Sequence, residues 1–305
     1  MFYTTSSARL TYRGDGCGTH ARPARSLVFL WLATAWLAFV ASSIAQTGSE
    51  SLDEQSLSEA RLQLMRNRAL AFQFKGKAIP KKLQETPLFR YDDVPRGYLD
   101  GTVWRLGAKG RPLAIVTTEL HPRYGLHGTN RSNPKVVYDL VSMADSGFEA
   151  RSPDIVWTPK KSFVKLKKLV NVDPPASSKA KRLIQLRNLA RRFKVMQRVS
   201  ETGFENQSLM LRLLPRNIDR YVPAPANANS DAAIFLFVAG RMPGVLLMLE
   251  TDGDDWQFGI ARLSAPCEIE VTFADGTVWY AKPDYGGSDE PYFATNATAV
   301  IPGVN

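Results

Sequence analysis

The residues best suited to chemistry stand close together in one segment, at Glu119, His121 and His127. A carboxylate and two imidazoles could bind zinc or serve a hydrolase as general base. The spacing argues against both, because five residues between two loop histidines match no established ligand spacing. No Gly-x-Ser-x-Gly elbow supplies a nucleophile either. This segment is therefore kept as the alternative function, a hydrolase or metal-dependent enzyme.

Motifs for cofactors and for other catalytic centres are missing from the sequence. It contains no Walker loop, no Gly-x-Gly-x-x-Gly, no Cys-x-x-Cys and no His-Glu-x-x-His. We therefore expect no bound cofactor and no metal, and we favour a non-catalytic binding or structural role over an enzyme.

Positive charge is concentrated in one block of the chain. Residues 160–198 carry 13 Lys or Arg and one acid, Asp173, whereas residues 231–305 carry 11 acids and three bases. Within the basic block, apolar residues recur at three and four positions after residues 174–178, which predicts an amphipathic helix. Four cations form a second stripe on this predicted helix and are the candidate polyanion site: Arg187, Arg191, Lys194 and Arg198.

Two interpretations of this basic stripe stay open. Charge runs are usually solvated faces, so the helix is expected to cover a sheet with its cations in water. The functional alternative is a surface for anionic lipid or acidic polysaccharide. Nucleic acid is disfavoured, because the protein is expected to be exported and no nucleic-acid motif accompanies the charge.

Tryptophan marks the expected strand starts after the leader. Four residues fit this role as core anchors: Trp104, Trp157, Trp256 and Trp279. If Asp275 and Gly276 form a two-residue hairpin turn, Phe273 pairs with Val278, and Trp279 shares the opposite face with Glu270. Trp279 is therefore the candidate sugar-stacking residue, although packing under a helix or a second sheet is the favoured interpretation.

The first 45 residues are typical of a secretory leader. Arginines precede the apolar segment 27–41, and Ser43 and Ala45 supply the small residues that a signal peptidase requires. We expect cleavage after Ala45 and export to the periplasm or the outside of the cell. The alternative is an uncleaved anchor in the inner membrane, with residues 27–45 as the membrane contact. Cleavage would leave Cys267 as the only cysteine, and its alternating context predicts burial.

The remaining pattern predicts a β-rich α+β fold. A helix is expected over residues 56–73, with Ser56 and Glu59 as its capping box, in an N-terminal region of residues 46–80. Short bursts of strand formers then predict antiparallel clusters in residues 81–170 and 171–305, joined by the basic helix, and the second cluster is a meander. Whether residues 81–305 form one domain with one core stays open.

One pentapeptide, Asp-Gly-Thr-Val-Trp, occurs twice, at residues 100–104 and 275–279. Asp-Gly favours a turn and Thr-Val-Trp favours a strand, so each copy is expected to form a turn that leads into a strand. The second copy predicts a hairpin and the first a loop or bulge before a strand. An old duplication is left open.

The chain resembles a family of predicted exported proteins associated with planctomycete bacteria. The segments that carry the resemblance lie in order between residues 80 and 282, and include Pro87–Tyr91, Gly101–Trp104, Arg182–Phe193, Leu211–Pro215 and Gly244–Glu250. The resemblance implies export and one architectural unit for the basic helix and the meander, and it brings no activity.

Overall fold

A computed structural model of the chain describes residues 54–75, 84–94, 97–107, 110–122, 133–199, 208–224, 227, 229–251 and 253–304. Residues 55–305 form one compact unit, and residues 1–54 are assigned to another. The expected leader and His127 lie outside the described residues. Within the described ranges, no helix combines the length and the apolar character that a membrane span needs.

The first half of the larger unit follows a simple path. A helix that includes residues 54–70 leads directly into β1 (Gln73–Lys75). A four-stranded meander follows: β2 (Phe89–Asp93), β3 (Tyr98–Leu106), β4 (Ala114–His121) and β5 (Lys135–Ser142). The chain then returns to β1, because β6 (Glu149–Arg151) pairs with β1 and β7 (Val156–Trp157) pairs with β6.

The second half repeats this path. Helix α2 (Lys179–Arg191) leads directly into β9 (Phe193–Val199), whose outer edge pairs with β10 (Ser208–Met210). A meander follows: β12 (Asp219–Tyr221), β13 (Asp231–Ala239), β14 (Met242–Thr251) and β15 (Trp256–Arg262), with β11 (Arg212–Leu213) also on β13. Then β16 (Cys267–Phe273) pairs with β9, and β17 (Gly276–Ala281) pairs with β16.

The last strand of each half belongs to the sheet of the other half. After β7, the chain forms β8 (Lys167–Lys168), which pairs with β15. After β17, it forms β18 (Tyr292–Thr298), which pairs with β5. The resulting main sheets have the orders β18-β5-β4-β3-β2 and β11-β13-β14-β15-β8. The exchange is therefore reciprocal, and all described strand pairs are antiparallel.

The amino-acid sequence repeats along with the topology. Residues 61–75 align without a gap with residues 182–196, and the identical pairs are Arg61 and Arg182, Leu62 and Leu183, Arg66 and Arg187, Asn67 and Asn188, Ala69 and Ala190, and Phe72 and Phe193. The strand register agrees with this offset, because Phe74 pairs with Ala150 and Val195 pairs with Val271. The chain is thus an internal repeat of one topology.

An ion pair between a partly exposed arginine and a buried aspartate is also repeated in the two halves. Arg90 Nε donates to Asp100 over 2.9 Å, and Arg220 Nε donates to Asp231 over 2.9 Å. Each arginine also donates to a helical carbonyl at matching positions, Ser58 O over 2.7 Å and Lys179 O over 2.9 Å. Charge-assisted bidentate pairs are among the stronger side-chain contacts, so each one fastens its helix to its meander.

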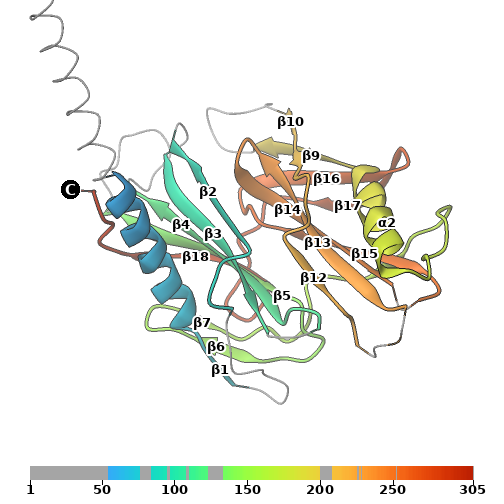
Figure 1. Ribbon diagram of the computed structural model, residues 1–305. Coiled ribbons are helices and arrows are strands. Elements are labelled where there is room, and N and C mark those ends of the chain that lie inside the picture. The colour runs from blue at the N-terminus through green and yellow to red at the C-terminus, as the bar shows by residue number, and fades with distance from the viewer. Residues whose placement is uncertain are drawn as a thin grey trace, which may run out of the picture. The chain divides into compact units, whose positions relative to one another are not determined.

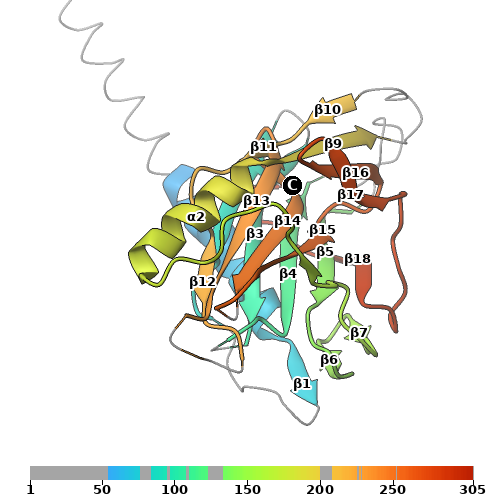
Figure 2. The same cartoon turned by 90° about the vertical axis from the view of Figure 1, so that its right-hand side faces the viewer.

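The two main sheets lie face to face between the two helices (Figure 1). One apolar cluster contains residues of both sheets, for example Val103 and Ile115 from the first with Ile234 and Leu246 from the second. Two further clusters fill the outer faces, one beneath the N-terminal helix and one beneath α2. The turned view shows α2 across β13 (Figure 2). The two halves therefore share an inter-sheet core.

Burial on both faces explains the composition of the central strands. All nine residues of β13 are buried, as are all residues of β14 after Met242. A strand that is covered on both faces reads as a continuous apolar run and does not alternate. The β-rich α+β class predicted from the sequence is confirmed, as is the burial of Cys267 and of Trp104.

Both helices differ in extent from their predictions. The N-terminal helix ends at residue 70 and already includes residues 54 and 55, so the prediction of Ser56 as the capping residue is wrong. Helix α2 begins after Ser178, whose side chain accepts from the Lys181 amide over 3.2 Å, and it ends at Arg191. The following residues form β9, because their alternate apolar side chains are buried against β16.

The two Asp-Gly-Thr-Val-Trp copies occupy unrelated places in the repeat. The first copy lies inside β3, and the predicted bulge is present where the copy begins, because the β2–β3 register shifts between the Tyr91–Gly101 and Asp93–Tyr98 pairs. The second copy begins inside a turn formed by Ala274 and Asp275, which both have positive φ, and Gly276 begins β17. Trp157 and Trp279 are the equivalent tryptophans, because they pair with the equivalent residues Ala150 and Val271.

The exchanged segment of the first half packs closely on Gly259 of β15. A Cβ at Gly259 would lie 2.2 Å from Val164 Cγ1 and 3.1 Å from Leu166 Cδ2. We expect Gly259→Ala to lower the free energy of unfolding by about 1–3 kcal/mol in urea titrations, because overpacking forces side chains or backbone to shift. The control is Gly276→Ala, whose nearest neighbour would be 3.8 Å away. Equal effects of the two substitutions would contradict this packing.

Candidate functional site

Glu119 and His121 contact each other, as the candidate enzyme site requires, but they are engaged inside the fold. Glu119 is buried on β4, where Tyr91 Oη donates to it over 2.6 Å. His121 Nε2 lies 3.2 Å from the other carboxylate oxygen, and its ring meets the Tyr98 ring edge-on. Among the described residues, no three His, Cys, Asp or Glu side chains are placed to hold a metal. The placement of His127 is outside the described ranges.

A second buried carboxyl, Asp139, was not predicted from the sequence. Tyr292 Oη from the exchanged strand β18 donates to it, and Thr117 Oγ1 donates over 3.2 Å. Burial raises the pKa of Asp139 to about 6, and the nearby Glu119 contributes to the rise, while these hydrogen bonds and Arg262 oppose it. Two carboxyls in one dry environment favour a protonated form of one of them.

The second half shows that the fold does not need this carboxyl pair. Glu250 is the counterpart of Glu119, and Tyr221 donates to it as Tyr91 does to Glu119. Glu250 is neutralised by Arg111, whose Nε and Nη2 lie 2.9 and 2.7 Å from its oxygens. The register places Gly259 at the position of Asp139, so no second carboxyl is present there.

The four cations predicted to line one helical face are divided between two elements. Arg187 and Arg191 lie on α2, whereas Lys194 and Arg198 lie on β9, so the predicted continuous stripe is wrong. The physical reason is that residues 193–199 alternate as a strand beside the acidic β16. Lys194 lies 3.3 Å from Asp275, and Arg198 lies 2.5 Å from Glu268 and 3.8 Å from Glu270.

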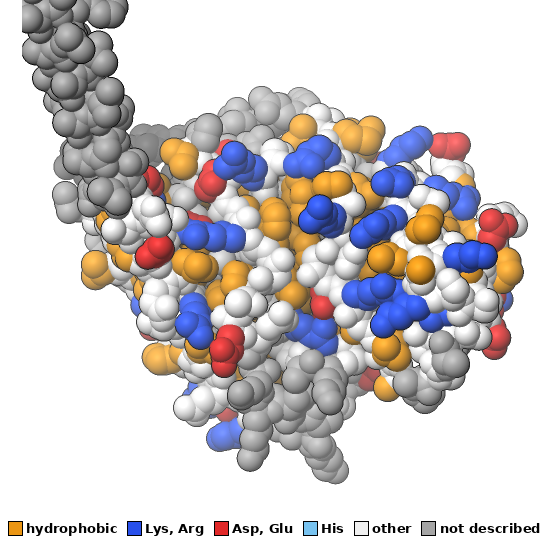
Figure 3. Space-filling view, in the orientation of Figure 1, with side chains coloured by type: hydrophobic (Ala, Val, Ile, Leu, Met, Phe, Trp, Pro, Cys, Tyr) orange, Lys and Arg blue, Asp and Glu red, His pale blue; other side chains and the backbone are white. Residues whose placement is uncertain are grey.

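The surface over α2 remains rich in Lys and Arg (Figure 3). Arg191 is exposed and donates to Asn188 over 3.1 Å, whereas Arg187 is only partly exposed. Half of the candidate polyanion site is therefore neutralised by β16 and its turn, and the helical half has two arginines of unequal exposure.

The predicted register of Trp279 is also wrong. Trp279 pairs with Val271, and Tyr280 pairs with Glu270, because the turn lies one residue earlier and a bulge follows Val271. Trp279 thus packs against the apolar cluster beneath α2, and it is partly buried. Tyr280 takes the outward position that was expected for Trp279, with 48% of its surface exposed.

Trp279 nonetheless lines a cavity of about 530 Å³. Its apolar wall includes Phe163 and Ile260, and three lysines also line it: Lys165, Lys167 and Lys282. We call this cavity the lysine pocket. Its volume lies within the range of ordinary ligand sites. Sequence reasoning found Trp279 but missed the lysines, because the exchange brings residues 163–167 to β15 and β17.

The charges of the lysine pocket are only partly compensated. The Arg262 guanidinium is buried and donates to backbone carbonyls, including Lys282 O over 2.6 Å. Lys167 Nζ donates to Val278 O over 3.1 Å. Lys165 and Lys282 are exposed and form no ion pair within the part of the chain that the structure describes. The acid that lines the pocket is Asp284.

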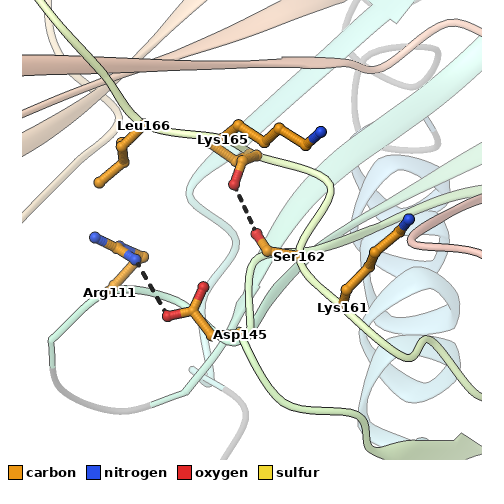
Figure 4. A pocket seen from close by; sticks show the side chains of 7 residues that line it. Arg111, Asp145, Lys161, Ser162, Lys165 and Leu166 are labelled. Carbon is orange, nitrogen blue, oxygen red and sulfur yellow. Dashed lines mark hydrogen bonds and ion pairs between the residues drawn. The ribbon is translucent and has the colours of Figure 1, made fainter.

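A second cavity of about 410 Å³ adjoins the lysine pocket and shares Lys165 with it. Arg111 and Asp145 lie on one side, 3.8 Å apart, and Lys161 lies on the other (Figure 4). The side chains of Lys161 and Lys165 both point away from the Arg111–Asp145 pair (Figure 4). Ser162 Oγ donates to Val164 O over 3.0 Å and shapes the segment between these lysines.

The lysines of the exchanged segment are not required by the exchange. Lys168 pairs with Gln257 as Asn296 pairs with Val137, so the register aligns Lys165, Lys167 and Lys168 with Phe293, Thr295 and Asn296. The second half completes the same strand exchange without a cation at these positions. The fold alone therefore does not account for the basic character of this segment.

Comparisons of the chain with protein-family models, with curated proteins and with solved structures find no match.

The buried Asp139 predicts a specific pH dependence of stability. Because its pKa is raised to about 6 in the folded state, its contribution to stability is fully present below its unfolded pKa. That contribution is lost as the pH rises through about 6, at roughly 1.4 kcal/mol for each pH unit that separates the folded and unfolded pKa values. We expect urea unfolding between pH 4 and pH 7 to show this decline, and Asp139→Asn to flatten it.

The matched control is Asp145→Asn, since the Asp145 side chain is 87% exposed. This variant is expected to keep the pH dependence of the unmodified chain. An Asp139→Asn protein with an unchanged decline would show that another group causes it.

Proposed function

We propose that the chain is an exported cell-envelope protein that binds an acidic polysaccharide through the lysine pocket, without catalysis. The observation that carries the proposal is the placement of Trp279 and two lysines without an ion pair, Lys165 and Lys282, around one cavity of the described fold. An indole offers a broad apolar surface to the C–H face of a sugar ring, and ammonium groups attract its carboxylate. The lysine pocket therefore offers both an apolar surface for the ring and positive charge for the carboxylate of an acidic sugar.

Electrostatics supports a polymer with repeated negative charge as the ligand. The chain stays positively charged without the expected leader, whose charged residues are four arginines and Asp15, and the exchanged segment adds lysines that the fold does not require. A positive surface raises the local concentration of anions and speeds their association. Lysine contributes as a point charge with three donors, which suits carboxylates in varied orientations.

Export is part of this proposal and is supported by the leader pattern of residues 1–45 and by the family resemblance. An exported protein meets acidic polysaccharides, and no nucleic-acid motif accompanies the positive charge. The enzyme alternative has less support, because Glu119 accepts from Tyr91 and contacts His121 within the described fold.

The test measures the binding of polygalacturonate to the mature chain by tryptophan fluorescence and by calorimetry. We expect Lys165→Gln and Lys282→Gln each to weaken binding by roughly three- to tenfold, or about 0.7–1.4 kcal/mol. Trp279→Ala is expected to cost about tenfold or more, because large aromatic anchors carry much of the binding energy. Binding should weaken as salt is raised, since the exposed charges are screened.

Two controls separate the pocket from charge in general. Lys179→Gln with Lys181→Gln removes two exposed cations of α2 and should leave binding unchanged. Fully methyl-esterified polygalacturonate should not bind. If the α2 variant lost binding while the pocket variants bound as tightly as the unmodified chain, the site would lie on the basic helix and the lysine pocket would be refuted.

A further inference from the structure

We infer that the outward side of α2 is a docking surface for an anionic lipid membrane. This inference goes beyond the proposed function, because none of the described residues that line the lysine pocket belongs to α2. The surface comprises three exposed cations, Lys179, Lys181 and Arg191, together with the exposed aliphatic side chain of Ile184. We call this surface the α2 face.

Helical periodicity places these side chains on one side of α2, which lies on the outside of the molecule over β13 (Figure 2). Lys181, Ile184, Asn188 and Arg191 follow the three- and four-residue spacing of a single helical face, and all four are exposed. The opposite side, which includes Leu186, is buried in the cluster beneath the helix. Ile184 keeps 58% of its surface exposed, so an apolar side chain stands among cations on the solvent side.

The charge of the α2 face is positive and uncompensated. Helix α2 contains five Lys or Arg and no Asp or Glu. One of the five, Arg182, is buried and pairs with Asp231, so it belongs to the fold. Lys179, Lys181 and Arg191 form no ion pair within the part of the chain that the structure describes. These three cations are therefore available to an anionic partner.

The N-terminal helix supplies an internal comparison for the α2 face. At the offset that aligns residues 61–75 with residues 182–196, the members of the α2 face correspond to residues of different character: Lys179 to Ser58, Lys181 to Ala60, Ile184 to Gln63 and Arg191 to Leu70. Gln63 is exposed, as Ile184 is. Both helices cover a meander in the same way, so the fold requires neither these cations nor an exposed isoleucine. Arg187 recurs as Arg66 and is therefore left out of the α2 face.

The combination of cations with an exposed aliphatic side chain favours a lipid surface as the partner. A basic helix on a membrane buries apolar side chains at the boundary between headgroups and acyl chains, and its Lys and Arg meet anionic headgroups. A hydrated polysaccharide or a nucleic-acid backbone offers charge but no apolar phase for Ile184. Three cations and one aliphatic side chain form a small contact, so the attachment is reversible and sensitive to salt.

The experiment measures co-sedimentation of the mature chain with vesicles of phosphatidylglycerol and phosphatidylcholine in equal parts, and with vesicles of phosphatidylcholine alone. We expect binding to the anionic vesicles only, and weaker binding as salt is raised. Lys181→Ala should weaken binding by roughly fivefold. Ile184→Gln should weaken it several-fold without any change of charge. Both substitutions introduce the residue that the N-terminal helix has at the equivalent position, which favours retention of the helix.

The controls exchange the two surfaces and the two ligands. Lys165→Gln and Lys282→Gln, which are expected to weaken polygalacturonate binding, should leave vesicle binding unchanged. Ile184→Gln should leave polygalacturonate binding unchanged. Thermal unfolding of each variant checks that the fold is retained.

The outcomes distinguish this inference from the proposed function. If the unmodified chain does not bind anionic vesicles, or if neither Lys181→Ala nor Ile184→Gln weakens that binding, the α2 face is refuted while the lysine pocket stands. If vesicle binding behaves as expected and polygalacturonate does not bind, the proposed function fails and the α2 face stands. Single-stranded DNA that binds more tightly than the vesicles, with the same loss in Ile184→Gln, would assign the α2 face to another partner and overturn the inference.

Discussion

The reciprocal exchange of β8 and β18 is the constraint on which the rest of the structure depends. Each half builds a meander whose last strand leaves one edge open, and the other half fills that edge. Backbone groups of a strand edge need partners when they are buried, so neither half completes its own sheet. The Tyr292–Asp139 hydrogen bond and the backbone hydrogen bond from Leu169 to Trp256 O, 2.8 Å long, fasten the two exchanged strands.

The two halves perform the same exchange, so a comparison of them shows at which positions the side chain can differ without loss of the topology. Equivalent positions in the two halves have the same backbone structure but often different side chains. A side chain that is present in only one half is therefore not required by the topology that both halves share. The contacts that recur, such as Arg90–Asp100 and Arg220–Asp231, are those that hold a helix to a meander. Features that do not recur include the buried Asp139, the Arg111–Glu250 pair and the lysines of the exchanged segment. Burial of an ionisable group is costly when the fold does not need it, which makes Asp139 informative.

Sequence reasoning predicted most of the strands and the β-rich class, because turn residues and apolar runs mark them directly. It failed where the same residues fit both the helical and the strand periodicity. Residues 193–198 fit a continued helical stripe and also alternate as a strand, and their pairing with β16 decides in favour of the strand. A turn at residues 274–275 or at 275–276 would by itself leave Trp279 on the outward face, opposite Glu270 or Thr272, so the bulge after Val271 alone gives Trp279 its inward orientation. A shift of one residue in register reverses every side chain.

The candidate site was harder to predict than the fold. Asp139 is hidden in the apolar run of β5, and its partner Tyr292 lies 153 residues away. The lysine pocket combines an exchanged segment with a hairpin, which no local pattern reveals. The internal repeat was detectable in principle, since residues 61–75 and 182–196 align without a gap. The repeated pentapeptide marks two positions that the topology does not equate.

Reciprocal exchange requires the exchanged strands and the central sheets to unfold together. Native-state hydrogen exchange measures this, because it assigns an opening free energy to each strand. The backbone amides of β18 bonded to β5 are predicted to be protected by the same global opening as those of β13. Protection of β13 with a much lower opening free energy for β18 would show that the strand is an independent attachment, and would contradict the reciprocal exchange as the constraint that holds the fold.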